Sequence, residues 1–137
     1  MPETGLIAFS DPQSVKGALG IKARLTDIFL QVKLNGDMAL IQAIEKLLLA
    51  EEEKAPGTVL DQHFIANSTQ GFDAWKQNIE GQSLDALIEQ TGLRLWQIEE
   101  TVAALKDKTK IIACWAMGLT QHKNAVDTIK EVVNLLL

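Results

Sequence analysis

Two short polar clusters in this 137-residue chain each follow an apolar run and contain a glycine. The first is Asn35-Gly36-Asp37, and the second is Met117-Gly118-Leu119-Thr120-Gln121. Glycine allows close approach to the backbone, while carboxylate and amide side chains accept or donate hydrogen bonds. Such groups suit the edge of a bound heterocycle and do not suit acid–base catalysis. For the first cluster alone, the commoner interpretation is a turn in which Asp37 caps a helix.

The other reactive side chains form no catalytic constellation. His63 and His122 are the two histidines, and neither has a second ligand at metal-binding spacing. Cys114 lies within an apolar run, where a small buried thiol is the usual case. The sequence contains neither a Gly-x-Ser-x-Gly elbow nor a phosphate-binding glycine loop. We therefore expect Cys114 in the core, His122 without an assigned role, and neither a metal site nor a catalytic residue.

The elements expected to position the two clusters are strands. Residues 27–34 alternate apolar and polar positions, which is typical of a strand. Residues 110–117, KIIACWAM, are a continuous apolar run, as expected for a strand covered by helices on both faces. Helical spacing and capping residues predict helices over about 38–53, 58–65, 71–79, 83–91, 95–105 and roughly the last 15 residues. Residues 6–20 are expected to be an irregular loop.

This order of elements predicts an α/β protein with parallel strands. The fold class expected is a partial dinucleotide-binding-like domain with a short parallel sheet flanked by helices. The whole chain, 1–137, is interpreted as a single partial domain, with an irregular segment at 1–25 and the α/β region at 26–137. Two strands make a poor sheet, and a free strand edge invites pairing with another chain. We therefore expect a piece of a larger protein that forms homo-oligomers in isolation.

Composition argues against several classes of partner. The formal net charge is −5, and the 13 lysines and arginines are scattered, which argues against nucleic acid. No apolar stretch approaches the ~18 residues of a membrane span, and the N-terminus lacks the pattern of a secretory signal. A single cysteine excludes a disulfide framework within the chain. These features favour a cytoplasmic protein that binds neither nucleic acid nor a membrane.

The second cluster carries a family resemblance. The run WAMGLTQHKNAVDTIKEVVNLLL resembles the molybdopterin oxidoreductases of the dimethyl sulfoxide reductase superfamily, closest to the formate dehydrogenase alpha-subunit-like branch. The resemblance extends upstream through FLQVKLNGDMALIQAIEKLLL, VLDQHFIANSTQGFDAW and LDALIEQTGLRLWQIEE, and so covers roughly 26–137. The Trp-x-Met-Gly-x-x-Gln-His pattern is fairly specific, whereas the Asn-Gly-Asp turn by itself is weak.

The resemblance implies a cofactor and its contacts. In this family, bis(molybdopterin guanine dinucleotide) lies along the carboxyl ends of the strands of such domains. The turn that touches the guanosine end matches Asn35, Gly36 and Asp37, and Asp37 is expected to accept hydrogen bonds from the guanine or ribose. The turn that contacts the pterin matches Met117, Gly118 and Gln121. The glycine allows close backbone approach, and the glutamine supplies a donor and an acceptor.

Departures from the family limit what this chain does alone. The segment that carries the metal-ligating cysteine, selenocysteine or serine is absent, as are the cysteines that hold an iron–sulfur cluster in many members. The hypothesis is therefore a cofactor-binding fragment of a catalytic subunit, whose partner is the remainder of that subunit and which binds no cofactor by itself. The alternative is a stand-alone, non-enzymatic α/β module with a regulatory or assembly role.

Overall fold

The computed structural model describes residues 8–9 and 13–137. The chain divides into two compact units, Met1–Leu30 and Gln31–Leu137. Within the first unit, β1 (Ala8–Phe9) pairs antiparallel with β2 (Ala23–Arg24), and the one-turn helix α1 (Val15–Ala18) lies between them in sequence. The loop expected at 6–20 is therefore wrong in part, although residues 1–7 and 10–12 lie outside the described residues.

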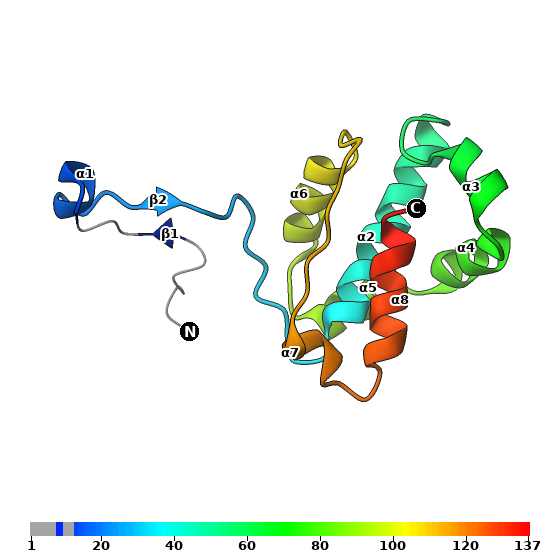
Figure 1. Cartoon of the computed structure of the whole chain (residues 1–137). Helices are drawn as coiled ribbons and strands as arrows, with labels where there is room; N and C mark the ends of the chain where they lie inside the picture. The colour runs from blue at the N-terminus through cyan, green and yellow to red at the C-terminus, as the bar shows by residue number, and fades with distance from the viewer. Residues whose placement is uncertain (1–7, 10–12) are drawn as a thin grey trace. The chain divides into compact units, whose positions relative to one another are not determined.

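The second unit consists of helices and the loops that connect them (Figure 1). In chain order the helices are α2 (Asp37–Lys54), α3 (Gln62–Ser68), α4 (Phe72–Gly81), α5 (Leu84–Thr91), α6 (Leu95–Leu105), α7 (Met117–Thr120) and α8 (Ala125–Leu135). The helices predicted over 38–53, 71–79, 83–91 and 95–105 are confirmed. The helix predicted from residue 58 begins later, because Asp61 is the capping residue and its carboxylate accepts from the Phe64 N–H at 2.9 Å.

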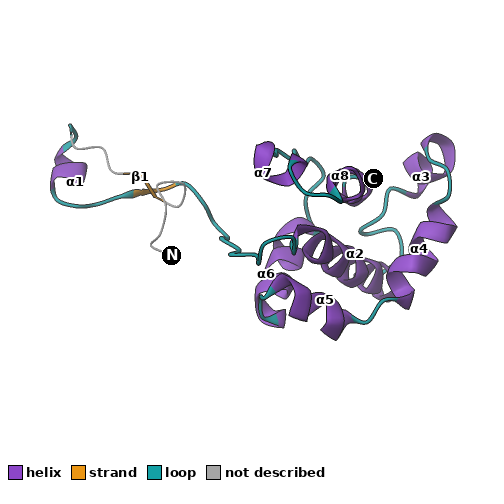
Figure 2. Ribbon diagram, turned by 90° about the horizontal axis from the view of Figure 1, so that it is seen from below, coloured by secondary structure: helices purple, strands orange, loops and turns teal. Residues whose placement is uncertain are grey.

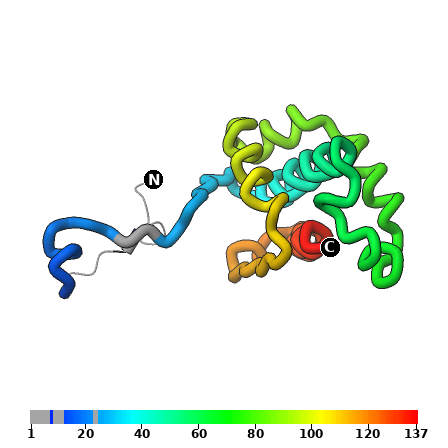
Figure 3. The backbone as a smooth tube through the Cα atoms, turned by 90° about the horizontal axis from the view of Figure 1, so that it is seen from above, coloured from blue at the N-terminus to red at the C-terminus, as the bar shows by residue number. Residues whose placement is uncertain are grey.

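Helix α2 is the centre of this unit. It contacts α4, α5, α6 and α8, and Figures 2 and 3 show α8 on one side of it with α5 and α6 on the other. Ala39 and Ala43 are buried on α2 together with Ile44, and the small alanines allow neighbouring helices to approach closely. Asp37 in the first turn and Lys54 in the last complement the helix dipole. A single long helix thus supplies much of the surface on which the others pack.

The loop before α2 is fixed against the end of α5. The Lys33 N–H donates to the Thr91 carbonyl at 2.9 Å, and the buried Thr91 hydroxyl accepts from the Leu93 N–H at 3.0 Å. Gly92 ends α5 at a φ of 72°, a left-handed conformation that favours glycine. The start of α2 is therefore held in place by residues more than 50 positions later in the sequence.

The parallel sheet and the α/β fold class predicted from the sequence are wrong. Neither 27–34 nor 110–117 is a strand, and the only strands in the described part of the chain are the two-residue pair of the first unit. Among described residues, no backbone hydrogen bond joins 109–115 to any other segment. An apolar run becomes a strand only where a neighbouring strand satisfies its N–H and C=O groups. No such neighbouring strand is present among residues 8–9 and 13–137, and Ile112 is 89% exposed.

Candidate functional site

An open groove of about 630 Å³ joins the two polar clusters. One wall comes from residues 32–34 and the first turns of α2, and the other from residues 113–122, with two side chains of α8 at the base. Asp37 and Gly118 both line it, as does His122. The groove is otherwise mainly apolar. Figure 1 shows why the clusters meet: the start of α2 and the short helix α7 lie at the same end of the unit.

The first cluster is a turn into a helix. Asn35 has a φ of 65°, an uncommon conformation that asparagine tolerates better than most residues. Gly36 is buried and is the N-cap of α2, but its N–H already donates to the Lys33 carbonyl at 2.9 Å. A Cβ added to Gly36 would lie 2.9 Å from the Gln90 carbonyl oxygen. Gly36 is thus used in the packing of the chain itself, while the half-buried Asp37 side chain faces the groove.

The second cluster forms the short helix α7. Met117 is 70% exposed, and Gln121 is exposed at the end of the helix. A Cβ added to Gly118 would meet no heavy atom within 4 Å, so the space beside this glycine is open. The structure therefore places Asp37 and Gly118 on one groove, whereas Asn35, Gly36, Met117 and Gln121 do not line it. The cofactor-binding role of all six remains a prediction.

Cys114 corrects one expectation from the sequence. It is exposed and lines the groove, where a core position was expected. The reason is the missing strand, since Cys114 belongs to the run that lacks a sheet to pack into. His63 is exposed, and His122 is half-buried at the groove and precedes α8 in the sequence. Among described residues, no group of three or more His, Cys, Asp or Glu side chains has metal-binding geometry.

A second site, not foreseen from the sequence, contains two buried acids. Glu45 of α2 and Glu131 of α8 are 2% and 8% exposed. Glu131 accepts from the Gln42 amide at 2.7 Å, from the Asn134 amide at 2.9 Å and from the Trp75 indole N–H at 3.3 Å. Burial, and to a lesser degree the charge of Glu131, raise the pKa of Glu45 to about 9. The only sequence signal was the recurrence of polar residues on one face of a helix otherwise rich in apolar side chains.

Comparison with known proteins yields several relatives. The chain is 44% identical to the uncharacterized oxidoreductase Rv2900c of Mycobacterium tuberculosis, and the match covers all of this chain and 18% of the relative. It is 30% identical to protein YdeP of Escherichia coli over all of this chain and 19% of that protein. Formate dehydrogenase H of Escherichia coli is 23% identical over 96% of this chain and 17% of the enzyme. The chain matches one part of larger oxidoreductases.

The matches cover only a part of each relative. The chain spans about a fifth of the length of the curated relatives it matches. No protein-family model matches the sequence. No solved structure matches the fold. No helix in the described part of the chain is long and apolar enough to cross a membrane.

Proposed function

We propose that this chain is a cofactor-binding segment of a formate dehydrogenase-like molybdopterin oxidoreductase. The observation that carries the proposal is the 23% identity to formate dehydrogenase H over 96% of the chain. The family resemblance of the Trp-x-Met-Gly-x-x-Gln-His run points to a bis(molybdopterin guanine dinucleotide) cofactor. When bound, that cofactor supplies the redox chemistry, and the protein supplies binding and orientation.

The residues on and beside the groove suit hydrogen bonding to such a cofactor. A volume of about 630 Å³ lies within the range of small-molecule sites. The Asp37 carboxylate would accept hydrogen bonds from the N–H groups of a guanine edge, a charge-assisted contact that is stronger than a neutral one. The open space beside Gly118 would allow a flat or branched group to approach the backbone. Met117 and Gln121 would contact the pterin from the exposed side of α7, and Asn35 and Gly36 would hold Asp37 in position.

Nuclear magnetic resonance titration of the chain with guanosine diphosphate tests this proposal, because it detects even millimolar binding. We expect chemical-shift changes concentrated at the amides of 35–37, the turn matched to the guanosine end, and smaller changes there with adenosine diphosphate. Asp37→Asn should weaken guanosine diphosphate binding at least tenfold, because the amide places an NH2 donor where the carboxylate has a second acceptor oxygen facing the N–H groups of the guanine edge. Asp85→Asn, in the first turn of α5, is the matched control. Equal shifts with both nucleotides would contradict the assignment of this groove.

A further inference from the structure

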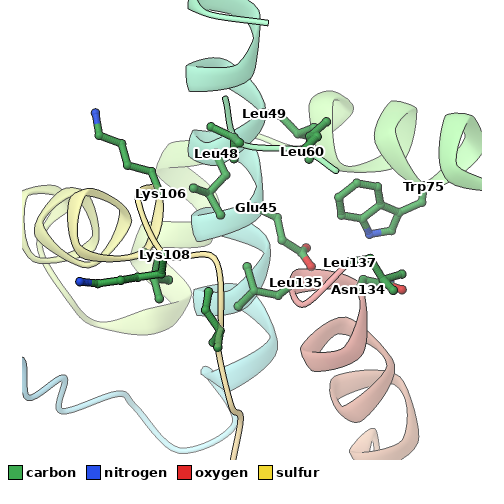
Figure 4. A pocket seen from close by; sticks show the side chains of 13 residues that line it. Glu45, Leu48, Leu49, Leu60, Trp75, Lys106, Lys108, Asn134, Leu135 and Leu137 are labelled. Carbon is green, nitrogen blue, oxygen red and sulfur yellow. The ribbon is translucent and has the colours of Figure 1, made fainter. Parts of the chain in front are cut away.

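A small cavity, partly open to solvent, lies between α2, α4 and α8. Its volume is about 100 Å³, and most of its lining is apolar, including Leu48, Leu60 and Leu135. Figure 4 shows the Glu45 carboxyl group directed into this space, with the Trp75 ring on one side and the end of α8 on the other. The cavity shares one lining residue, Leu135, with the groove that contains Asp37 and Gly118, and its other lining residues are different.

The Glu45 carboxyl group lacks a partner in this cavity. The residue is 2% exposed, and neither of its oxygens has a hydrogen-bond partner among the described residues. A buried polar group without a hydrogen bond is destabilising, and buried acids are nearly always paired. The Glu45 carboxyl group is therefore available to form a hydrogen bond or an ion pair with a bound group.

The charges around the cavity indicate the sign of that group. Glu131 is buried nearby, and its three donors, Gln42, Trp75 and Asn134, are all neutral. Two cations, Lys106 and Lys108, line the cavity. Lys106, however, pairs with Glu51 at 3.2 Å, and Figure 4 shows both lysine side chains directed away from Glu45. Two acids thus lie at one helix junction, and no cation of the described part of the chain forms an ion pair with either of them.

The size and lining of the cavity restrict the cation further. A cavity of about 150 Å³ holds benzene, so one of about 100 Å³ holds roughly four or five non-hydrogen atoms. The apolar lining suits a short alkyl chain, and the face of Trp75 attracts a cation. The Asn134 amide donates to Glu131 through its nitrogen, which leaves its Oδ1 to accept a hydrogen bond from an ammonium group.

We propose that this cavity is a binding site for a primary alkylammonium group, with the Glu45 carboxylate as its counter-ion. Trp75 and Asn134 complete the contacts of the ammonium group. The group belongs either to a free amine of three or four carbons or to the tip of a lysine side chain presented by another polypeptide. This site is independent of the cofactor-binding groove proposed above.

Binding of the ammonium group changes the protonation of Glu45. Because burial raises the pKa of Glu45 to about 9, the empty site holds a neutral carboxyl group at pH 7. The incoming ammonium group stabilises the carboxylate, so the proton of Glu45 leaves to the solvent as the ion pair forms. Close to one proton is therefore released for each ammonium group bound at pH 7, and the release falls toward zero above pH 9.

Titration of the chain with n-butylammonium chloride tests the proposal. We expect saturable, millimolar binding with shifts of the Trp75 indole resonance, and calorimetry in buffers of different ionisation enthalpy should show the release of a proton. Glu45→Gln should weaken binding at least tenfold, whereas Glu53→Gln, an exposed acid on the same helix, should leave it unchanged. 1-Butanol has the same size without the charge and should bind at least tenfold more weakly than butylammonium.

The outcomes separate the two sources of the ammonium group. Tighter binding of a short lysine-containing peptide than of butylammonium would identify a lysine side chain as the natural occupant, and the reverse would identify a free amine. The proposal is overturned if butanol binds as tightly as butylammonium, or if Glu45→Gln binds butylammonium as tightly as the unaltered chain. It is also overturned if the Trp75 indole resonance does not shift at a saturating concentration of butylammonium chloride, with the ionic strength held constant. Because the chain and the Glu45→Gln variant are both assayed by circular dichroism, loss of binding is distinguishable from loss of fold.

Discussion

The two buried acids of α2 differ in how the chain surrounds them. Glu45 is without a hydrogen bond among the described residues, whereas Glu52 accepts four. The N–H groups of Gly57, Val59 and Leu60 donate to Glu52 at 2.6, 2.9 and 3.1 Å, and the Gln62 amide donates at 3.2 Å. Burial raises the pKa of Glu52, but these donors outweigh it and lower the pKa to about 2. One acid therefore opposes folding at neutral pH while the other favours it.

Replacing Glu45 should change how stability depends on pH. Its pKa is about 9 in the folded chain and about 4.5 in the unfolded chain, so the folded state binds the extra proton between these values. The free energy of unfolding should therefore fall as pH rises, by about 1.4 kcal/mol per pH unit from this residue. Glu45→Gln removes that slope and should be the more stable protein at pH 8. Urea unfolding at several pH values measures this dependence. The account would be refuted if the free energy of unfolding changed with pH equally in the unaltered chain and in Glu45→Gln.

Replacing Glu52 should change the pH dependence of stability in the opposite direction. Its folded pKa of about 2 lies below the unfolded value of 4.5, so its stabilisation is present above pH 4.5 and lost as pH falls toward 2. Glu52→Gln should lower the free energy of unfolding by about 2 kcal/mol at pH 7, because charged hydrogen bonds are lost. The difference should shrink at pH 3. Glu53→Gln is the control for both acids, and an equal loss in that variant would argue against the loop contacts.

At the scale of elements, the longer helices α2, α4, α5 and α6 were predictable from the sequence, whereas the one-turn helices α1 and α7 and the strands were not. The predicted helix over 83–91 is confirmed with its caps, because the Ser83 hydroxyl accepts from the Ala86 N–H and Gly92 ends the helix. These signals lie within a few residues of the helix they define. The run 110–117 carries no information about whether a neighbouring strand exists, so its apolar pattern misled. Strands were expected to position Asp37 and Gly118, but the structure brings these residues to one groove through α2 and α7.

The junction between the 31–36 loop and α5 gives a test at this scale. A Cβ at Gly36 would lie 2.9 Å from the Gln90 carbonyl oxygen and 3.1 Å from that of Lys33, and both are backbone atoms that cannot shift independently. Gly36→Ala should therefore destabilise the chain by about 2 kcal/mol, as measured by thermal unfolding. Gly81→Ala, at the end of α4 with nothing within 4 Å, is the control. A neutral Gly36→Ala would show that α5 is not held against this loop.

At the scale of the whole molecule, the apolar surface is the prominent feature. Leu34 and Ile112 are 90% and 89% exposed, on the segments wrongly predicted to be strands. Large exposed apolar areas mark surfaces that other polypeptide covers. The matched relatives are about five times longer than this chain, and further chain of that kind would supply the cover.

The isolated chain should cover this surface by self-association, as predicted from the sequence. Light scattering after size exclusion should give a mass above that of one chain, 15.1 kDa. Ile112→Asp should shift the distribution toward one chain without changing the helical circular dichroism, because this side chain contributes little to the fold. Ser68→Asp, at the polar end of α3, serves as the control. A monodisperse monomer of the unaltered chain would contradict the expectation.

The central claim, that this segment contributes contacts to a molybdopterin guanine dinucleotide, is tested most directly by cofactor content. The polypeptide that contains this segment would be purified with Gly118→Val, a change whose Cβ has no heavy atom of the described chain within 4 Å and which fills space beside the groove. The account predicts that molybdenum and releasable guanine nucleotide both fall at least tenfold while helical content is retained. A full load of cofactor in the Gly118→Val protein would contradict it.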